Sequence, residues 1–219
     1  SVCNYGKILN FENGDINFKN VSFKYPETNL YALKNINFSI SSGNTLGIIG
    51  KTGSGKSTIL ELITRSYDVT SGEIYLDDKI LSSYDLQSLK SFISYVPQNP
   101  FLFSDTIIEN IKFGNYTSSD DEVVKVAKDS SIHSDISRFK DQYETLLGER
   151  GVNLSGGQIQ RITIARALLK RSKILLLDDC LSSVDAKTES SILSNIKKVK
   201  KEETVIIVSN KISSVMHAD

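Results

Sequence analysis

The stretch LGIIGKTGSGKSTILELITR, residues 46–65, contains the strongest structural signal in the chain. It begins with a short apolar run, residues 46–49, of the kind that forms a central strand of a buried sheet. A glycine-rich loop follows, and we expect a helix over residues 56–65. The segment GKTGSGKS, residues 50–57, has the spacing G-x-x-x-x-G-K-[ST] between that strand and that helix. Strand, loop and helix in this order predict a loop that binds phosphate groups.

The residue types of this loop suit a nucleoside triphosphate. Gly50, Gly53 and Gly55 allow the backbone to curl, so that its N–H groups point inward at phosphate oxygens. The helix that follows adds the positive end of its dipole. We expect Lys56 to contact the β- and γ-phosphates and the Ser57 hydroxyl to be a ligand of Mg²⁺. The other nucleotide contacts predicted in this segment are Thr52, Ser54 and Thr58.

Further strands and helices are predicted on both sides of the loop. Residues 15–23 and 33–40 alternate polar and apolar side chains, which predicts an antiparallel β region. Residues 99–169 change to a helical pattern, and we expect an inserted helical lobe there. The remaining predicted elements are strands at 73–76, 93–96, 174–177 and 205–208 and a helix at 186–199. The predicted fold class is therefore α/β: a P-loop NTPase core with an N-terminal antiparallel β region and an inserted helical subdomain.

The composition narrows the class of protein. The chain has 219 residues, of which 39% are apolar and 24% charged, as in a soluble globular protein. The formal net charge is 0, so we expect no nucleic-acid partner. Cys3 and Cys180 lie far apart in the sequence, which favours a reducing cytosolic setting over a disulfide framework. No apolar run approaches the roughly 20 residues that span a bilayer. We therefore expect the fragment itself to be soluble.

Two aspartates follow the strand predicted at residues 174–177. Asp178 and Asp179 are adjacent at its end, in the segment ILLLDD. Carboxylates bind Mg²⁺ and accept protons, so a buried strand that ends in such a pair predicts a metal or a proton-transfer site.

The segment LSGGQ, residues 154–158, marks a second helix start. Ser155, Gly156 and Gly157 expose backbone N–H groups ahead of the helical sequence IQRITIARALL. A second anion-binding helix start in one domain is unusual. On these five residues alone, an ordinary capped helix is an equal alternative.

Taken in order, GKTGSGKS, LSGGQ and ILLLDD resemble the nucleotide-binding domain of ATP-binding cassette (ABC) transporters. The resemblance covers residues 15–219, and it is strongest for the exporter branch, because residues 106–111 (TIIENI) and 148–151 (GERG) are similar to exporter-type segments. It implies ATP and Mg²⁺ as cofactors. It also implies that residues 1–219 form one ABC ATP-binding domain, C-terminally truncated, with its helical lobe at about 99–169.

The resemblance gives roles to further residues. Tyr25 matches the aromatic side chain that stacks on adenine. Gln98 matches the glutamine that reaches the metal and the attacking water, and Asp178 matches the aspartate that holds Mg²⁺. Asp185 matches a loop aspartate that communicates across a dimer. Glu149 matches the segment that faces the coupling helix of a transmembrane partner.

In this family two domains pack head to tail, and each ATP lies between the phosphate loop of one domain and LSGGQ of the other. The resemblance therefore implies that Ser155, Gly156, Gly157 and Gln158 bind the nucleotide of a second nucleotide-binding domain. This arrangement explains why one chain carries two anion-binding helix starts.

Two residues depart from the family pattern. The family implies a glutamate directly after Asp178, where this chain has Asp179, and a histidine where this chain has Asn210. Aspartate withdraws the carboxylate by about one C–C bond, and a misplacement of about 1 Å can lower a rate on the order of 100-fold. Asparagine donates a hydrogen bond but does not exchange a proton as imidazole does. We expect Asp179, Gln98 and Asn210 to form the catalytic set. ATP binding depends on the phosphate loop, Ser57 and Asp178, so we expect binding without fast turnover at this chain's own site.

Two departures beside an intact LSGGQ indicate the degenerate-site subunit of a heterodimeric ABC exporter, whose partner keeps its glutamate and histidine. A homodimer with two equally weak sites is an alternative. Two others are a soluble ABC ATPase without a membrane partner, and a regulatory subunit that binds ATP without hydrolysing it. For the leading hypothesis we expect a transmembrane domain, fused N-terminally in the full-length protein, and a place at the cytoplasmic face of the cell membrane.

Overall fold

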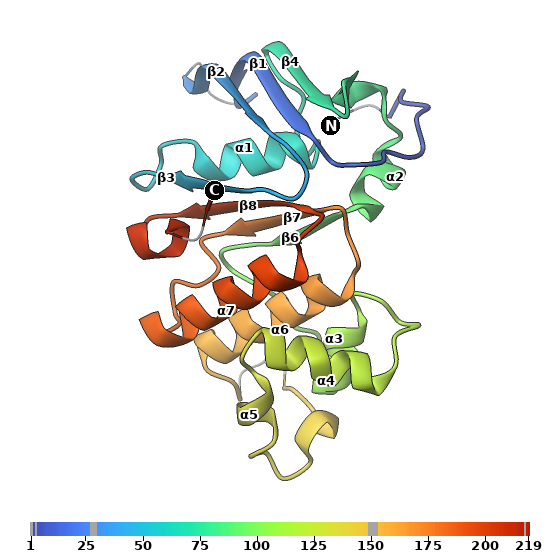
Figure 1. Cartoon of the computed structure of the whole chain (residues 1–219), viewed down its shortest axis with the longest axis vertical. Helices are drawn as coiled ribbons and strands as arrows, with labels where there is room; N and C mark the ends of the chain where they lie inside the picture. Colours follow the sequence, from blue (N-terminus) through green and yellow to red (C-terminus); the bar gives the residue numbers. More distant parts are fainter. Residues whose placement is uncertain (1, 3, 27–29, 149–152, 217) are drawn as a thin grey trace. The chain divides into compact units, whose positions relative to one another are not determined.

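The computed structural model describes residues 2, 4–26, 30–148, 153–216 and 218–219, which form two compact units (Figure 1). The first unit contains Ser1–Ile93, Ser172–Leu176 and Lys200–Asp219, and the second contains Ser94–Arg171 and Leu177–Val199. The division falls within strands β6 (Ile93–Val96) and β7 (Ile174–Asp178). The phosphate loop therefore belongs to the first unit, and the paired aspartates and LSGGQ belong to the second.

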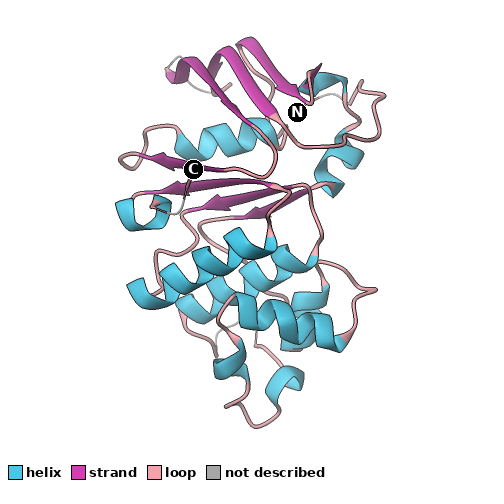
Figure 2. Ribbon diagram, viewed as in Figure 1, coloured by secondary structure: helices cyan, strands magenta, loops and turns pink. Residues whose placement is uncertain are grey.

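An antiparallel sheet in the first unit arises from the alternating N-terminal sequence (Figure 2). Its strand order is β2-β1-β4-β5, with bounds β2 (Tyr31–Ile40), β1 (Ile16–Lys24), β4 (Ser71–Leu76) and β5 (Lys79–Ile80). Successive side chains point to opposite faces of a strand, so Ile16 and Phe18 are buried on the same face. Phe18 stacks on Phe38 of β2, with ring centroids 4.4 Å apart.

A turn at Asp77 and Asp78 joins β4 to β5. Both residues have positive φ, 47° and 60°, as a two-residue type I′ hairpin turn requires. The Asp77 carboxylate accepts hydrogen bonds of 2.8 Å from the backbone N–H groups of residues 12–15. Burial alone would raise the pKa of Asp77, but these four donors lower it on balance. The turn thereby also fixes the segment that enters β1.

The second sheet has the strand order β3-β8-β7-β6, with β3 at Thr45–Ile49 and β8 at Thr204–Ser209. Strands β3 and β8 run parallel, and Leu46 of β3 pairs with Ile206 of β8. Every residue of β7 and β8 is buried, as in a parallel sheet covered on both faces. Helix α1 (Lys56–Ile63) follows β3 through the glycine-rich loop. It ends before the predicted residue 65 because Arg65 has a φ of 49°.

The second unit contains the helices of the predicted lobe and the long helix after the paired aspartates. Their bounds are α3 (Ile107–Lys112), α4 (Asp120–Asp129), α5 (His133–Ile136), α6 (Gly156–Leu169) and α7 (Ala186–Val199), with a 3₁₀ turn at Gln142–Glu144. Helix α6 packs against α3 and α4 (Figure 1). Ile162, Ile164, Ala165 and Leu168 of α6 are buried, which makes it the central helix of this unit.

The structure confirms the predicted fold class and the strands and long helices on which it rests. The sequence missed β5 and α2 (Leu86–Ser91), together with 3₁₀ turns at Leu81–Ser83 and Ile212–Val215. The start of α2 did carry a signal, because Asp85 accepts a hydrogen bond from Ser88 N as a helix N-cap. Among the described residues, no helix is both long and apolar enough to cross a bilayer.

Candidate functional site

The phosphate loop places a glycine at the start of α1. Gly55 is the N-cap residue and has a φ of 88°, and it supplies no side chain to cap the helix. A Cβ at this position would lie 2.5 Å from the backbone oxygen of Ala32. Glycine is therefore required here twice, by the left-handed conformation and by the close approach of β2. The result is a helix N-terminus that presents backbone N–H groups without a side-chain cap.

Lys56, the first residue of α1, lies over the loop with only 9% of its surface exposed. Its Nζ donates hydrogen bonds to the backbone oxygens of Gly50 and Lys51 and to Asn210 Oδ1, at 2.8, 2.9 and 2.9 Å. The structure thus brings together Lys56 and Asn210, two predicted site residues that are 154 positions apart. Within the loop, the Ser54 amide donates to the Lys51 oxygen at 3.2 Å.

The remaining loop residues lie where the motif predicts them. Gly53 has a positive φ of 79°, and Thr52 and Gly53 are exposed. Ser57 and Thr58 lie in the first turn of α1, and Thr58 is buried. Their contacts with a nucleotide remain predictions.

Tyr25 is tied to α1 by its hydroxyl. The hydroxyl donates a hydrogen bond to Glu61 Oε2 at 2.7 Å and lies 2.8 Å from Thr58 Oγ1. Its ring packs edge-on against Phe23 and Tyr67, with centroids 4.9 and 5.3 Å apart. Burial is the main reason that the pKa of Tyr25 is raised. These contacts fix the ring beside α1, and its stacking on adenine stays a prediction.

The paired aspartates have different surroundings. Asp178, at the end of β7, is 5% exposed, and its Oδ2 accepts a hydrogen bond from the Tyr95 hydroxyl at 2.9 Å. Asp179 leaves the strand with a φ of 44°, a left-handed conformation that aspartate tolerates better than most residues. Its Oδ2 lies 3.3 Å from Gln98 Nε2, which donates to it. The second unit therefore brings Gln98 and Asp179 together, and their catalytic roles stay predictions.

Tyr95 is a neighbour of the site that the sequence did not reveal. It lies on β6, and only the pairing of sheet strands brings its hydroxyl to Asp178.

The donors predicted for the metal are a hydroxyl (Ser57), a carboxylate (Asp178) and an amide oxygen (Gln98). These are the hard oxygen ligands that suit Mg²⁺, which keeps several waters and phosphate oxygens among its ligands. Among the described residues, no group of three or more His, Cys, Asp and Glu side chains forms a metal cluster. The chemistry of these three donors therefore suits Mg²⁺, and their role as its ligands stays a prediction.

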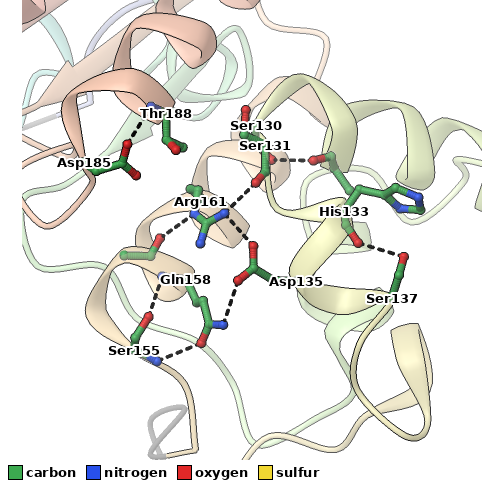
Figure 3. A network of polar contacts seen from close by, with 12 residues as sticks. Ser130, Ser131, His133, Asp135, Ser137, Ser155, Gln158, Arg161, Asp185 and Thr188 are labelled. Carbon is green, nitrogen blue, oxygen red and sulfur yellow. Dashed lines mark hydrogen bonds and ion pairs between the residues drawn. The ribbon is translucent and has the colours of Figure 1, made fainter.

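The signature segment (residues 154–158) forms the start of α6 (Figure 3). Ser155 is the N-cap: its Oγ accepts a hydrogen bond from Gln158 N at 3.3 Å, and Gln158 Oε1 accepts one from Ser155 N at 3.0 Å. This is a complete capping box. A Cβ on Gly157 would lie 2.8 Å from the backbone oxygen of Ser183, so glycine allows the following loop to approach α6 closely.

Two further predicted residues have different outcomes. Asp185 caps α7, because its Oδ1 accepts a hydrogen bond from Thr188 N at 3.0 Å (Figure 3). That backbone donor is the main reason that the pKa of Asp185 is lowered. Glu149 lies outside the described residues.

Comparisons with known proteins agree with these features. The sequence model described as ABC transporter matches residues 33–182. The chain is 47% identical over 206 residues to the Bacillus subtilis protein named uncharacterized ABC transporter ATP-binding protein YknU, covering 94% of this chain and 35% of that protein. It is 47% identical over 205 residues to the Escherichia coli multidrug resistance-like ATP-binding protein MdlA, again covering 94% and 35%.

A solved structure gives the same result in three dimensions. It is titled as a bacterial Atm1-family ABC exporter with ATP bound, and it superimposes with a TM-score of 0.93 at 36% sequence identity. The match covers 98% of this chain and 38% of that one, and the chain spans about a third of the length of the two curated relatives. The chain therefore belongs to the ABC transporter family, as an ATP-binding domain of the exporter type.

Proposed function

We propose that this chain binds and hydrolyses ATP to power a membrane exporter. The observation that carries the proposal is the start of α1, where Gly55 leaves the helix without a side-chain cap and Lys56 lies buried over the loop. The relatives support a transport role, since MdlA is named multidrug resistance-like and the solved relative is titled an ABC exporter. The domain works at the cytoplasmic face of the cell membrane with a transmembrane domain of the same protein.

The reaction is the hydrolysis of the terminal phosphoanhydride bond of ATP. The oxygen of a water molecule bonds to the γ-phosphorus, the bond from that phosphorus to the bridging oxygen breaks, and ADP leaves. A proton of the water passes to the Asp179 carboxylate, while Lys56 stabilises the charge on the phosphate oxygens. Ser57, Asp178 and Gln98 would hold Mg²⁺, which neutralises the same oxygens when bound.

Turnover at this chain's own site is slow. The carboxylate of Asp179 is one carbon shorter than that of a glutamate, and it accepts a hydrogen bond from Gln98 at 3.3 Å. Asn210 turns its Oδ1 towards Lys56 Nζ, at 2.9 Å, and its amide does not exchange protons as an imidazole does. ATP binding is retained, because it depends on the loop, Lys56 and Ser57.

The intact signature segment completes the site of a second nucleotide-binding domain. We place the fast site there, in a different chain that keeps the glutamate and the histidine. Gly156 and Gly157 supply backbone N–H donors to its nucleotide, and Ser155 supplies a hydroxyl that its own helix already orients.

The experiment is ATP hydrolysis by the full-length complex purified from its native host. Restoring both family residues with Asp179→Glu and Asn210→His is expected to raise turnover at this chain's site on the order of 100-fold, the lower end of the range for a positioned base. Asn195→His on α7 adds the same imidazole elsewhere and is the matched control. An unchanged rate after the double substitution would refute the roles of Asp179 and Asn210. Hydrolysis by the unmodified isolated chain as fast as that of an intact cassette would refute the slow site.

The same two residues support a second candidate, a regulatory subunit that binds ATP and never hydrolyses it. ATP binding without any hydrolysis by the native complex would favour that role. Purification of a complex with a single kind of cassette would instead favour a homodimer with two weak sites.

A further inference from the structure

The start of α6 is held from outside the helix by a carboxylate on α5. Asp135 Oδ1 accepts a hydrogen bond from Gln158 Nε2 at 3.1 Å, and Asp135 Oδ2 accepts one from Arg161 Nη1 at 2.8 Å (Figure 3). The side chains of Arg161 and Asp135 are only 14% and 26% exposed. Each oxygen of the carboxylate therefore has its own donor, in a place largely shielded from water.

Arg161 is itself fixed, so it holds Asp135 in one position. Its Nε donates to the backbone oxygen of Gly157 at 3.2 Å, and its Nη1 also donates to that of Ser131 at 2.5 Å. Burial alone would raise the pKa of Asp135, but the hydrogen bonds from Arg161 and Gln158 lower it on balance. A carboxylate held in the charged form is an acceptor only.

This acceptor determines which way the Gln158 amide faces. A side-chain amide has a donor end and an acceptor end of almost the same shape, and its neighbours select the orientation. Because Asp135 only accepts, it must face Nε2, and Oε1 is then turned towards Ser155 N, 3.0 Å away. The reversed amide would set its NH₂ group against the Ser155 N–H and break the capping box.

We infer that Asp135 is a positioning residue for hydrolysis at the partner's site. It orients Gln158, and through Gln158 it fixes the backbone and hydroxyl of Ser155. The inference rests on the proposed function, in which the signature segment completes the nucleotide site of a second domain. Asp135 lies on α5, outside the LSGGQ segment, so the motif alone does not reveal its role.

Asp135→Asn tests the orientation with almost no change of shape. The new amide has one acceptor, which Arg161 takes because its hydrogen bond is charge-assisted. The NH₂ of the new residue then faces Gln158, whose amide must reverse and abandon Ser155 N. We expect turnover at the completed site to fall about tenfold, as for a misplacement of a fraction of 1 Å. The thermal midpoint is expected to move by only about 2–4 °C.

Gln158→Glu provides the rescue. Alone, it places a carboxylate against Asp135 and is expected to lower turnover as well, because two like charges meet in a shielded place. Combined with Asp135→Asn, each group regains a partner: one Glu oxygen accepts from Ser155 N, and the other accepts from the new NH₂. We expect the double variant to hydrolyse ATP faster than either single variant, which is a clear departure from additivity.

All variants are measured in the full-length complex, with Asp141→Asn as the matched control. The Asp141→Asn substitution makes the same chemical change at an exposed residue of the same lobe. A second readout needs no catalysis: amide hydrogen exchange at Ser155, followed by NMR on the chain. Exchange at Ser155 is expected to be faster in Asp135→Asn and to return to the rate of the unmodified protein in the double variant.

The outcomes separate the two proposals. Ser155→Ala with an unchanged rate would refute the role of the signature segment in the proposed function, while the exchange result still decides whether Asp135 orients Gln158. Loss of activity in Ser155→Ala, together with normal activity and exchange in Asp135→Asn, would overturn the inference alone. Simple addition of the two losses in the double variant would also overturn it, since a purely structural role predicts that result.

Discussion

The starts of helices α1 and α6 differ in how their first N–H groups are treated. Every helix leaves its first four N–H groups without partners inside the helix. At α6, Ser155 and Gln158 cap each other, and Asp135 holds the pair. At α1, the N-cap is Gly55, which has no side chain, and the first turn contains no acidic residue. The start of α6 is capped by side chains of its own chain, whereas the uncapped start of α1 suits an anion.

The difference indicates how each start contributes to binding. Helix α1 supplies a cradle and the buried ammonium of Lys56, so we expect it to provide most of the affinity for nucleotide. Helix α6 supplies an already ordered surface, with the N–H groups of Gly156 and Gly157 left at its tip, so we expect it to provide geometry. When the binding groups are already ordered before the ligand arrives, little conformational entropy is lost on binding.

The largest expected effect is on ATP affinity at α1. Lys56→Ala removes a charged donor to the phosphates, a hydrogen bond of roughly 1.5–3 kcal/mol. Affinity for ATP with Mg²⁺ is therefore expected to fall between about 10-fold and 100-fold in isothermal titration. Lys34→Ala, at an exposed position of β2, is the control and is expected to bind normally. Normal binding by Lys56→Ala would remove the basis of the comparison.

The next effect concerns the two glycines at the tip of α6. A Cβ on Gly157 would lie 2.8 Å from a backbone oxygen of Ser183, whereas a Cβ on Gly156 would lie 3.5 Å from a side-chain oxygen of that residue. Gly157→Ala is expected to lower the free energy of unfolding by about 1–3 kcal/mol, because backbone must shift. Gly156→Ala is expected to be neutral or to stabilise by up to about 1 kcal/mol, through helix propensity. Urea unfolding of the isolated chain measures both, and equal losses would show that the Ser183 approach is unimportant.

The sequence located both helix starts, but it predicted only part of what supports them. The phosphate loop and the helix start at LSGGQ are local features, and local spacing predicts them well. The capping box between Ser155 and Gln158 was found only in the structure. The contact from Asp135 was missed, because helix packing brings α5 to the start of α6. Tyr95 was missed for the same reason, since strand pairing brings it to Asp178. Helix α2 was missed because six residues are too few for an apolar period to show.

A smaller effect is expected from the capping hydroxyl. Ser155→Ala removes the acceptor for Gln158 N, and loss of an N-cap typically costs about 1 kcal/mol. The hydrogen bond from Ser155 N to Gln158 Oε1 remains, so α6 is expected to stay folded. Ser137→Ala removes an exposed hydroxyl that donates to the His133 oxygen, and it is the control, with an expected change within about 0.5 kcal/mol. A loss for Ser155→Ala no larger than the control would mean that α6 is not stabilised by its cap.

The smallest expected effect is on the pH dependence of the unfolding free energy, and it is expected to differ between the starts of α6 and α1. The pKa of Asp135 is lowered in the folded chain, so its contribution is fully present above the unfolded pKa of about 3.9 and is lost as pH falls through the lower folded pKa. No carboxylate lies in the first turn of α1, so α1 has no such dependence there.

Asp135→Asn is therefore expected to flatten the fall in unfolding free energy between about pH 5 and pH 3, the range in which an unfolded aspartate takes up its proton. The pKa of Asp77 in the first unit is also lowered. Its protonation lowers the unfolding free energy of both proteins by the same amount, so this contribution cancels in the difference. Urea titrations at the two pH values give that difference directly. Parallel curves for the two proteins would show that Asp135 is not held in the charged form by Arg161 and Gln158, and α6 would then be capped by its own residues alone.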